Sequence, residues 1–140
     1  MSAREKIAKR VDRADFNAAL RIASVVGALE LLPVKAIPAE VLFRSTRGGE
    51  GEAFARHKLI YHLNTACGRS LNRVAAAIGR DRSTVSYAVR AIEDRRDEPG
   101  FDANLDREAR ICAELVEFGR EYDLVLAEFI ARAQRTGRAR

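Results

Sequence analysis

The sequence predicts an all-α fold, a small helical bundle with a helix-turn-helix and a long C-terminal helix. Three observations lead to this prediction. Of the 140 residues 6% are aromatic and none is tryptophan, whereas alanine and arginine dominate. Apolar residues recur at spacings of three and four along most of the chain, which is the period of a helix with one buried face. Most glycines and prolines fall where these stretches end, as they do at helix ends.

The first third of the chain predicts one long helix and one short helix. Residues 1–14 are charged and form a lead-in. Over residues 15–32 the apolar side chains recur at helical spacing, and Pro33 follows as a stop. Pro38 suits the first position of a helix, so we expect a short helix over residues 39–43.

A loop and four further helices are expected after this segment. The loop covers residues 44–51, which hold three glycines and two arginines. The helices are expected over residues 52–67, 71–78, 82–96 and 105–134. In the first of them Leu59, Ile60 and Leu63 face the core, and Gly68 ends it. Ser70 caps the second helix. The last is preceded by Pro99 and Gly100, which stop the helix before it.

We divide the chain into three parts, the lead-in (1–14), a helix-turn-helix domain (15–104) and a C-terminal amphipathic helix with a basic tail (105–140). The charge is distributed unevenly along these parts. Residues 44–96 carry 11 basic and 5 acidic side chains, a net charge of +6, whereas residues 1–43 carry +2 and residues 97–140 carry −3. A positive middle third attracts phosphate-rich partners.

The stretch from Ser70 to Arg90 has the pattern of a helix-turn-helix. This motif needs a small residue where its helices cross, a permissive residue in the turn and a branched apolar residue behind the second helix. Ala75, Gly79 and Val85 supply these at spacings of four and six. The side chains that close the small core behind them are Val74, Ile78, Ala88, Val89 and Ile92. The alternative is an α-hairpin with an incidental glycine turn. The polar character of the exposed positions, Arg82, Ser83, Thr84, Ser86 and Tyr87, favours DNA binding instead.

This stretch resembles the C-terminal DNA-binding domain (domain IV) of the bacterial replication initiator DnaA. The family signature Gly-Arg-Asp-His-Thr-Thr-Val is similar to Gly79-Arg-Asp-Arg-Ser-Thr-Val85, and Ser70-Leu71 occupy the matching positions upstream. The segment 55–61, Ala-Arg-His-Lys-Leu-Ile-Tyr, resembles the Ala-Arg-Gln segment of the family. The resemblance covers roughly residues 15–105.

The resemblance implies three kinds of contact with double-stranded DNA. Arg44 or Arg47 would enter the minor groove. Arg56 and His57 would hold phosphates or nearby bases, and the backbone at Leu71 would hold the phosphate chain from a helix N-terminus. The residues expected to read the major groove are Asp81, Arg82, Ser83 and Thr84. The other residues that we expect at the interface are Lys58, Arg80, Tyr87 and Arg90.

The chain departs from the family in two ways. Arg82 and Ser83 stand where the family has His and Thr, so the preferred DNA site differs from the family's box. No Gly-x-x-x-x-Gly-Lys-Ser/Thr motif is present, so the ATPase module is missing. We expect a sequence-specific regulator that recognises initiator-type boxes and modulates replication initiation or transcription. The alternative is a protein-interaction module that acts through its C-terminal helix.

That helix carries a heptad-like row of apolar residues, which we name the seam. It consists of Ile111, Leu115, Phe118, Tyr122, Val125 and Phe129, at spacings of 4, 3, 4, 3 and 4. One interpretation is that residues 105–133 bind a second copy or another protein. The other is that the seam packs back on the helix of residues 15–32 and completes the core, which the interruption at Gly119 favours.

Other classes of function find little support in the sequence. Cys67, Cys112, His57 and His62 lack metal-ligand spacing, and no catalytic constellation is evident, so we expect neither a cofactor nor enzyme activity. His62 is expected to be a packed or surface histidine. No apolar run approaches the roughly 20 residues that cross a bilayer. We expect a cytoplasmic, nucleoid-associated protein without a membrane partner. RNA binding is less favoured because exposed stacking aromatics are scarce.

Overall fold

A computed structural model describes residues 12–30, 42–43 and 49–138. These residues form α-helices and no β-strand, which confirms the predicted all-α bundle. The elements are α2 (Arg13–Glu30), α3 (Glu50–Thr65), α4 (Leu71–Ile78), α5 (Arg82–Glu93), the 3-10 turn η2 (Asp94–Asp97) and α6 (Pro99–Arg138). Within the described ranges, none of the helices is both long enough and apolar enough to cross a membrane.

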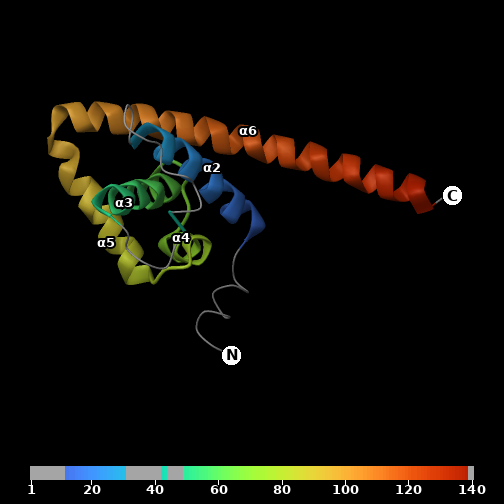
Figure 1. Cartoon of the computed structure of the whole chain (residues 1–140), viewed down its shortest axis with the longest axis horizontal. Helices are drawn as coiled ribbons and strands as arrows, with labels where there is room; N and C mark the ends of the chain where they lie inside the picture. Colours follow the sequence, from blue (N-terminus) through green and yellow to red (C-terminus); the bar gives the residue numbers. More distant parts are fainter. Residues whose placement is uncertain (1–11, 31–41, 44–48, 139–140) are drawn as a thin grey trace.

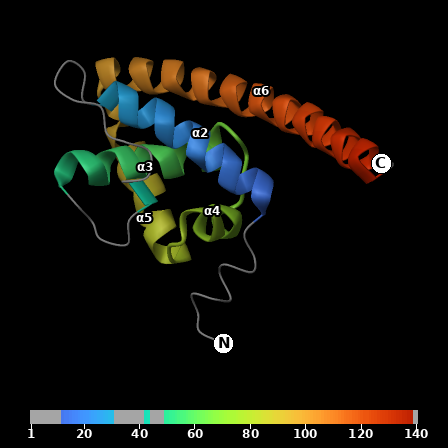
Figure 2. The same ribbon diagram turned by 45° about the vertical axis from the view of Figure 1, so that its right-hand side comes forward.

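Helices α2 and α6 lie side by side and run in opposite directions, and α3, α4 and α5 lie against one side of this pair (Figures 1 and 2). The far end of α6 projects beyond the rest of the bundle. The DNA-reading pair that the sequence predicts, α4 and α5, therefore lies away from that projecting end.

One main core joins the helices. Its fully covered side chains come from five helices and include Ile22, Val26, Leu59, Leu63, Val74, Val85 and Cys112. The predicted inward residues of α3, Leu59, Ile60 and Leu63, are all buried, as are Ala75, Ile78 and Ala88 of the predicted helix-turn-helix core. Phe16, which lies on the periodic face of α2, is 38% exposed and contacts the ring of Phe43. The expected helix over 39–43 and the loop over 44–51 lie mostly outside the described residues.

The last helix begins six residues earlier than the sequence predicts, at Pro99. Proline is well tolerated at a first helical position because that position needs no N–H donor. Pro99 therefore both follows the end of α5 and η2 and starts α6. Leu105, Glu108 and Cys112 are buried, so the first part of α6 belongs to the core of the bundle and not to a separate C-terminal part.

The contact between α2 and α6 does not use the seam. A Cβ atom at Gly119 would meet the guanidinium of Arg21, so the flexible end of this side chain of α2 lies directly against the backbone of α6 here. Four residues on, about one helical turn further, Asp123 accepts hydrogen bonds from Arg21 at 3.0 and 3.3 Å. Seam residues such as Phe118 and Val125 remain exposed. The interpretation that the seam packs back on α2 is therefore corrected: a neighbouring face of α6 makes that contact.

A buried group of charged side chains fixes α3 against α6. Glu108 of α6 accepts a hydrogen bond from Lys58 Nζ at 3.0 Å and lies 2.7 Å from Nε2 of His62. All three residues are buried. Although burial raises the pKa of Glu108, the hydrogen bond to His62 and the charge of Lys58 outweigh it and lower this pKa below its ordinary value. Glu108 is thus held as a carboxylate inside the bundle.

Candidate nucleic-acid interface

Helix α4 begins and ends where its local sequence requires. The Oγ atom of Ser70 accepts a hydrogen bond from the backbone N–H of Arg73 at 3.2 Å, which is the N-cap that the sequence predicts. Gly79 has a φ of +72°, and its N–H donates to the carbonyl of Ala75. A side chain with a Cβ is strained in this left-handed conformation. The turn between α4 and α5 therefore depends on glycine at position 79.

Helix α5 separates polar from apolar side chains along its length. Val85, Ala88 and Ile92 are buried on its inner face. On its outer face the exposed side chains are Arg82, Ser83, Thr84, Tyr87 and Arg90, and Asp81 is exposed at the N-cap. The carboxylate of Asp81 makes no capping hydrogen bond to the helix. The structure thus places the predicted major-groove residues together on one accessible helix end.

Tyr87 is held in place by an aromatic neighbour from α3. Its ring is 61% exposed, and it meets the ring of His57 edge-to-face with 5.8 Å between centroids. Such pairs contribute roughly 0.5–1.5 kcal/mol beyond the area that they bury. His57 therefore lies beside the outer face of α5, next to residues that the sequence predicts to touch DNA.

Arg56 and Lys58 lie inside the bundle, which corrects the contacts expected for them. Arg56 is 5% exposed and donates from Nε to the carbonyl of Leu42 at 2.8 Å. Burial, together with the nearby charge of Arg80, lowers its pKa. Lys58 is 7% exposed and is bound to Glu108. Side chains with so little free surface cannot grip a phosphate, so these two hold the scaffold behind the interface.

The remaining predicted contact residues lie around α5. Arg80 is half-buried in the turn before it. The side chain of Leu71 is partly buried against the core. Its backbone N–H, at the N-terminus of α4, is therefore the group that could contact a phosphate. Arg44 and Arg47 lie outside the described residues.

Sequence reasoning missed two polar links that position this surface. Asp15 of α2 is buried and accepts hydrogen bonds from Arg73 at 2.7 and 2.9 Å, so it fixes the start of α4. These bonds raise the pKa of Arg73. At the other end, Tyr61 of α3 donates to Glu93 of α5 at 2.9 Å. Each link joins residues more than 30 positions apart, so no local sequence motif predicts it.

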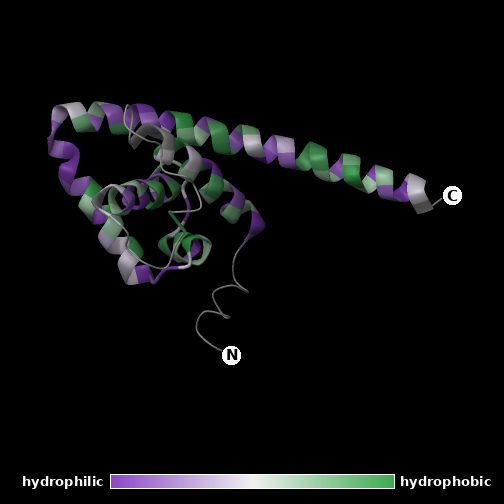
Figure 3. Cartoon of the chain, viewed as in Figure 1, coloured by the Kyte–Doolittle hydropathy of each residue, from purple (hydrophilic) through white to green (hydrophobic). Residues whose placement is uncertain are grey.

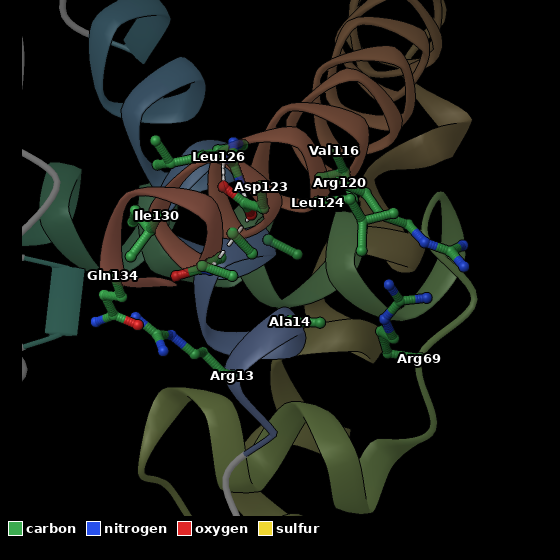
Figure 4. Close-up of a pocket in the computed structure, with 15 residues that line it drawn as sticks. Arg13, Ala14, Arg69, Val116, Arg120, Asp123, Leu124, Leu126, Ile130 and Gln134 are labelled. Atoms are coloured by element: carbon green, nitrogen blue, oxygen red, sulfur yellow. Dashed lines mark hydrogen bonds and ion pairs between the residues drawn. The ribbon is translucent and has the colours of Figure 1, made fainter. Parts of the chain in front are cut away.

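A hollow lies elsewhere in the described structure, between α2 and the projecting half of α6 (Figure 4). It has a volume of about 570 Å³. Leu126 and Ile130 line it together with small residues of α2, and Arg13, Arg69 and Arg120 stand around it. None of the predicted DNA-contact residues lines this groove.

Comparison of the chain with models of protein families, with curated proteins and with solved structures finds no match.

Proposed function

We propose that this protein binds double-stranded DNA in a sequence-specific manner and reads the major groove with the N-terminal half of α5. One observation carries the proposal. Arg82, Ser83 and Thr84 are exposed on the first turn of α5, while Val85 and Ala88 anchor the same helix in the core. A helix that is rigid on one side and polar on the other can insert its N-terminal side chains among base edges.

The chemistry of these side chains suits base recognition. An arginine can donate two hydrogen bonds to the O6 and N7 atoms of guanine, and a threonine methyl can touch the methyl group of thymine. Asp81 can accept a hydrogen bond from the amino group of cytosine. In the described part of the chain the side chains of Arg82, Ser83 and Thr84 have no hydrogen bond or ion pair, so binding DNA would not break an internal contact.

The start of α4 supplies a site that suits a phosphate. The first N–H groups of a helix have no partner within the helix, and they attract anions. The hydroxyl of Ser70 accepts from the N–H group of Arg73, whereas the N–H groups of Leu71 and Asn72 donate no hydrogen bond within the described residues. Arg73 itself is engaged with Asp15, so it orients the helix.

The proposed target is a replication-initiator-type box, and the proposed role is to modulate replication initiation or transcription. This part of the proposal rests on the resemblance of Gly79–Val85 and Ser70–Leu71 to the initiator signature. Arg82 in place of the family's histidine implies a shifted preference at one base pair.

Selection of bound duplexes from a random pool tests the proposal directly. We expect one enriched motif, which binds far more tightly than a scrambled duplex of the same composition. With roughly six phosphate contacts, the logarithm of affinity falls against the logarithm of salt concentration with a slope of about −5. Folded protein that enriches no motif at moderate ionic strength contradicts the proposal.

A further inference from the structure

The far half of α6 carries large apolar side chains that remain exposed in the described structure. Ten large hydrophobic residues of the described structure are exposed, and eight of them lie on α6. These are Ile111, Phe118, Tyr122, Leu124, Val125, Leu126, Phe129 and Ile130. Figure 3 shows hydrophobic residues recurring along α6 into its projecting half. A soluble monomer rarely exposes a contiguous apolar surface of this kind, and such surfaces mark interaction sites.

The seam forms the most regular part of this surface. Phe118, Tyr122, Val125 and Phe129 are 56–68% exposed and alternate at spacings of four and three. Successive residues of an α-helix are turned by about 100°, so these four share one stripe. The stripe is turned by about 90° from Gly119 and by about 130° from Asp123, which face α2. A second helix can therefore lie along the seam without displacing α2.

The charges beside the seam are ordered along the helix. One strip runs along the side of the seam that is turned away from α2. Its members are Glu114, Glu117, Glu121, Glu128, Arg132 and Arg135. From Glu114 onward the strip is first acidic and then basic. Glu128 is already bound to Arg132 of its own chain at 2.8 Å. In a parallel pair this strip would lie beside Gly119, Leu126 and Ala133 of the other helix, which carry no charge, whereas an antiparallel pair brings the two strips together with the basic end of each against the acidic start of the other.

We propose that a second copy of this chain binds along the seam and forms an antiparallel, two-fold symmetric dimer through α6. The alternating spacing is the one that keeps two α-helices in contact over several turns. A two-fold axis uses the same surface on both copies, which a single repeated stripe can satisfy. With the axis between Tyr122 and Val125, Phe118 packs against Phe129 of the second copy. The same register places Glu114 beside Arg135 of the second copy. It also places Glu121 beside Glu128, whose charge Arg132 of its own chain offsets.

The dimer has a consequence for DNA binding that rests on the function proposed above. It carries two α5 helices related by the same axis, so it favours paired, inverted half-sites. The dimer itself is tested without DNA, so failure of one proposal is distinguishable from failure of the other.

Light scattering on the purified full-length chain tests the dimer. We expect a mass about twice the 15.5 kDa of one chain. The double variant Val125→Glu/Phe129→Glu is expected to be monomeric and fully helical, because both side chains are exposed in the single chain. Leu124→Glu is the matched control, since Leu124 is 65% exposed but lies off the seam, and this variant remains dimeric. A monomeric wild-type chain, or equal effects of the seam and control variants, overturns the proposal.

Charge reversal tests the antiparallel register. Glu114→Arg alone and Arg135→Glu alone each place like charges together at both ends of the dimer, and each is expected to weaken the dimer several-fold. The double variant Glu114→Arg/Arg135→Glu restores opposite charges and is expected to recover most of the lost association. A double variant that is as weak as the two single changes combined overturns this register.

Discussion

The Nε2 atom of His62 lies 2.7 Å from the Oε1 atom of Glu108, and both residues are buried between α3 and α6. Lys58 binds the other carboxylate oxygen, so one acidic side chain of α6 serves two basic groups of α3. A buried charge that loses its partner is costly, because neither water nor a counter-charge replaces the lost interaction. The position of α6 therefore depends on this buried cluster.

The variant Glu108→Gln is expected to lower the free energy of unfolding by about 3 kcal/mol, since it leaves Lys58 buried without a counter-charge. Urea denaturation followed by circular dichroism measures the loss. Glu117→Gln, at an exposed position of the same helix, serves as the control and is expected to change stability by less than about 0.5 kcal/mol. Similar losses for both variants would show that the buried cluster is not the cause.

The same cluster makes stability depend on pH in a defined direction. The pKa of Glu108 is lowered in the folded state, by His62 and Lys58 against the effect of burial. A carboxylate with a lowered pKa stabilises the fold fully above its unfolded value, about 4.3 for glutamate, and loses this contribution as pH falls through the folded value. The stability difference between wild type and Glu108→Gln is expected to be constant from about pH 7 to 5 and to shrink below about pH 4. A difference that grows on acidification contradicts the assignment.

Gly79→Ala is expected to destabilise the protein by about 1–2 kcal/mol, because alanine must adopt the left-handed φ of +72°. No atom lies within 4 Å of the added Cβ, so the loss comes from the backbone alone. Gly100→Ala, in the first turn of α6, also adds a methyl group in open space but without a positive φ. That control is expected to be neutral or slightly stabilising in thermal unfolding.

Arg82→Ala is expected to weaken binding to the selected duplex by about 1–3 kcal/mol and to relax the preference at one base pair. The loss on a scrambled duplex is expected to be small. Arg107→Ala removes another exposed arginine, from α6, and serves as the charge-matched control. Fluorescence anisotropy with both duplexes separates the two effects. Equal losses of affinity on both duplexes for Arg82→Ala would contradict a role of Arg82 in base recognition.

The two cysteines are expected to differ in reactivity. Cys112 is fully buried, and burial together with the charge of Glu108 raises the pKa of its thiol to about 12. Cys67 is only partly buried, although burial raises its pKa as well. At mildly alkaline pH a thiol reagent is expected to modify Cys67 first. It is expected to modify Cys112 only as fast as the protein unfolds and exposes this thiol. Mass spectrometry of peptides over time gives both rates.

Much of the helix-turn-helix could be predicted because its signals are local. Ser70 and Gly79 mark both ends of α4, and the structure begins and ends the helix at the predicted residues. The burial of Val85 and Ala88 was expected from the helix-turn-helix pattern. Each of these predictions depends on neighbours within about one turn of helix, which the sequence displays directly.

The contacts between distant segments could not be predicted in the same way. Lys58 and Arg56 look like surface cations in the sequence, and only packing against Glu108 and Leu42 shows that they are interior. Gly119 appeared to interrupt the seam, whereas it lies on the face that α2 approaches. A helical period shows which residues share a face of α6, but it does not show which face meets α2.

Helix α6 spans 40 residues without a break, from a start that Leu105 anchors in the core to a projecting end. At a rise of 1.5 Å per residue it forms a rod of roughly 60 Å. The length of α6 and the direction in which its side chains face are therefore coupled. One residue inserted after Ile130 would rotate the remaining turns by about 100° about the helix axis and lengthen the rod by only about 1.5 Å. Seven inserted residues would nearly restore the direction of the tip and carry it about 10 Å further out. The number of residues in α6 therefore sets both how far its tip lies from the bundle and which way the side chains of the tip face.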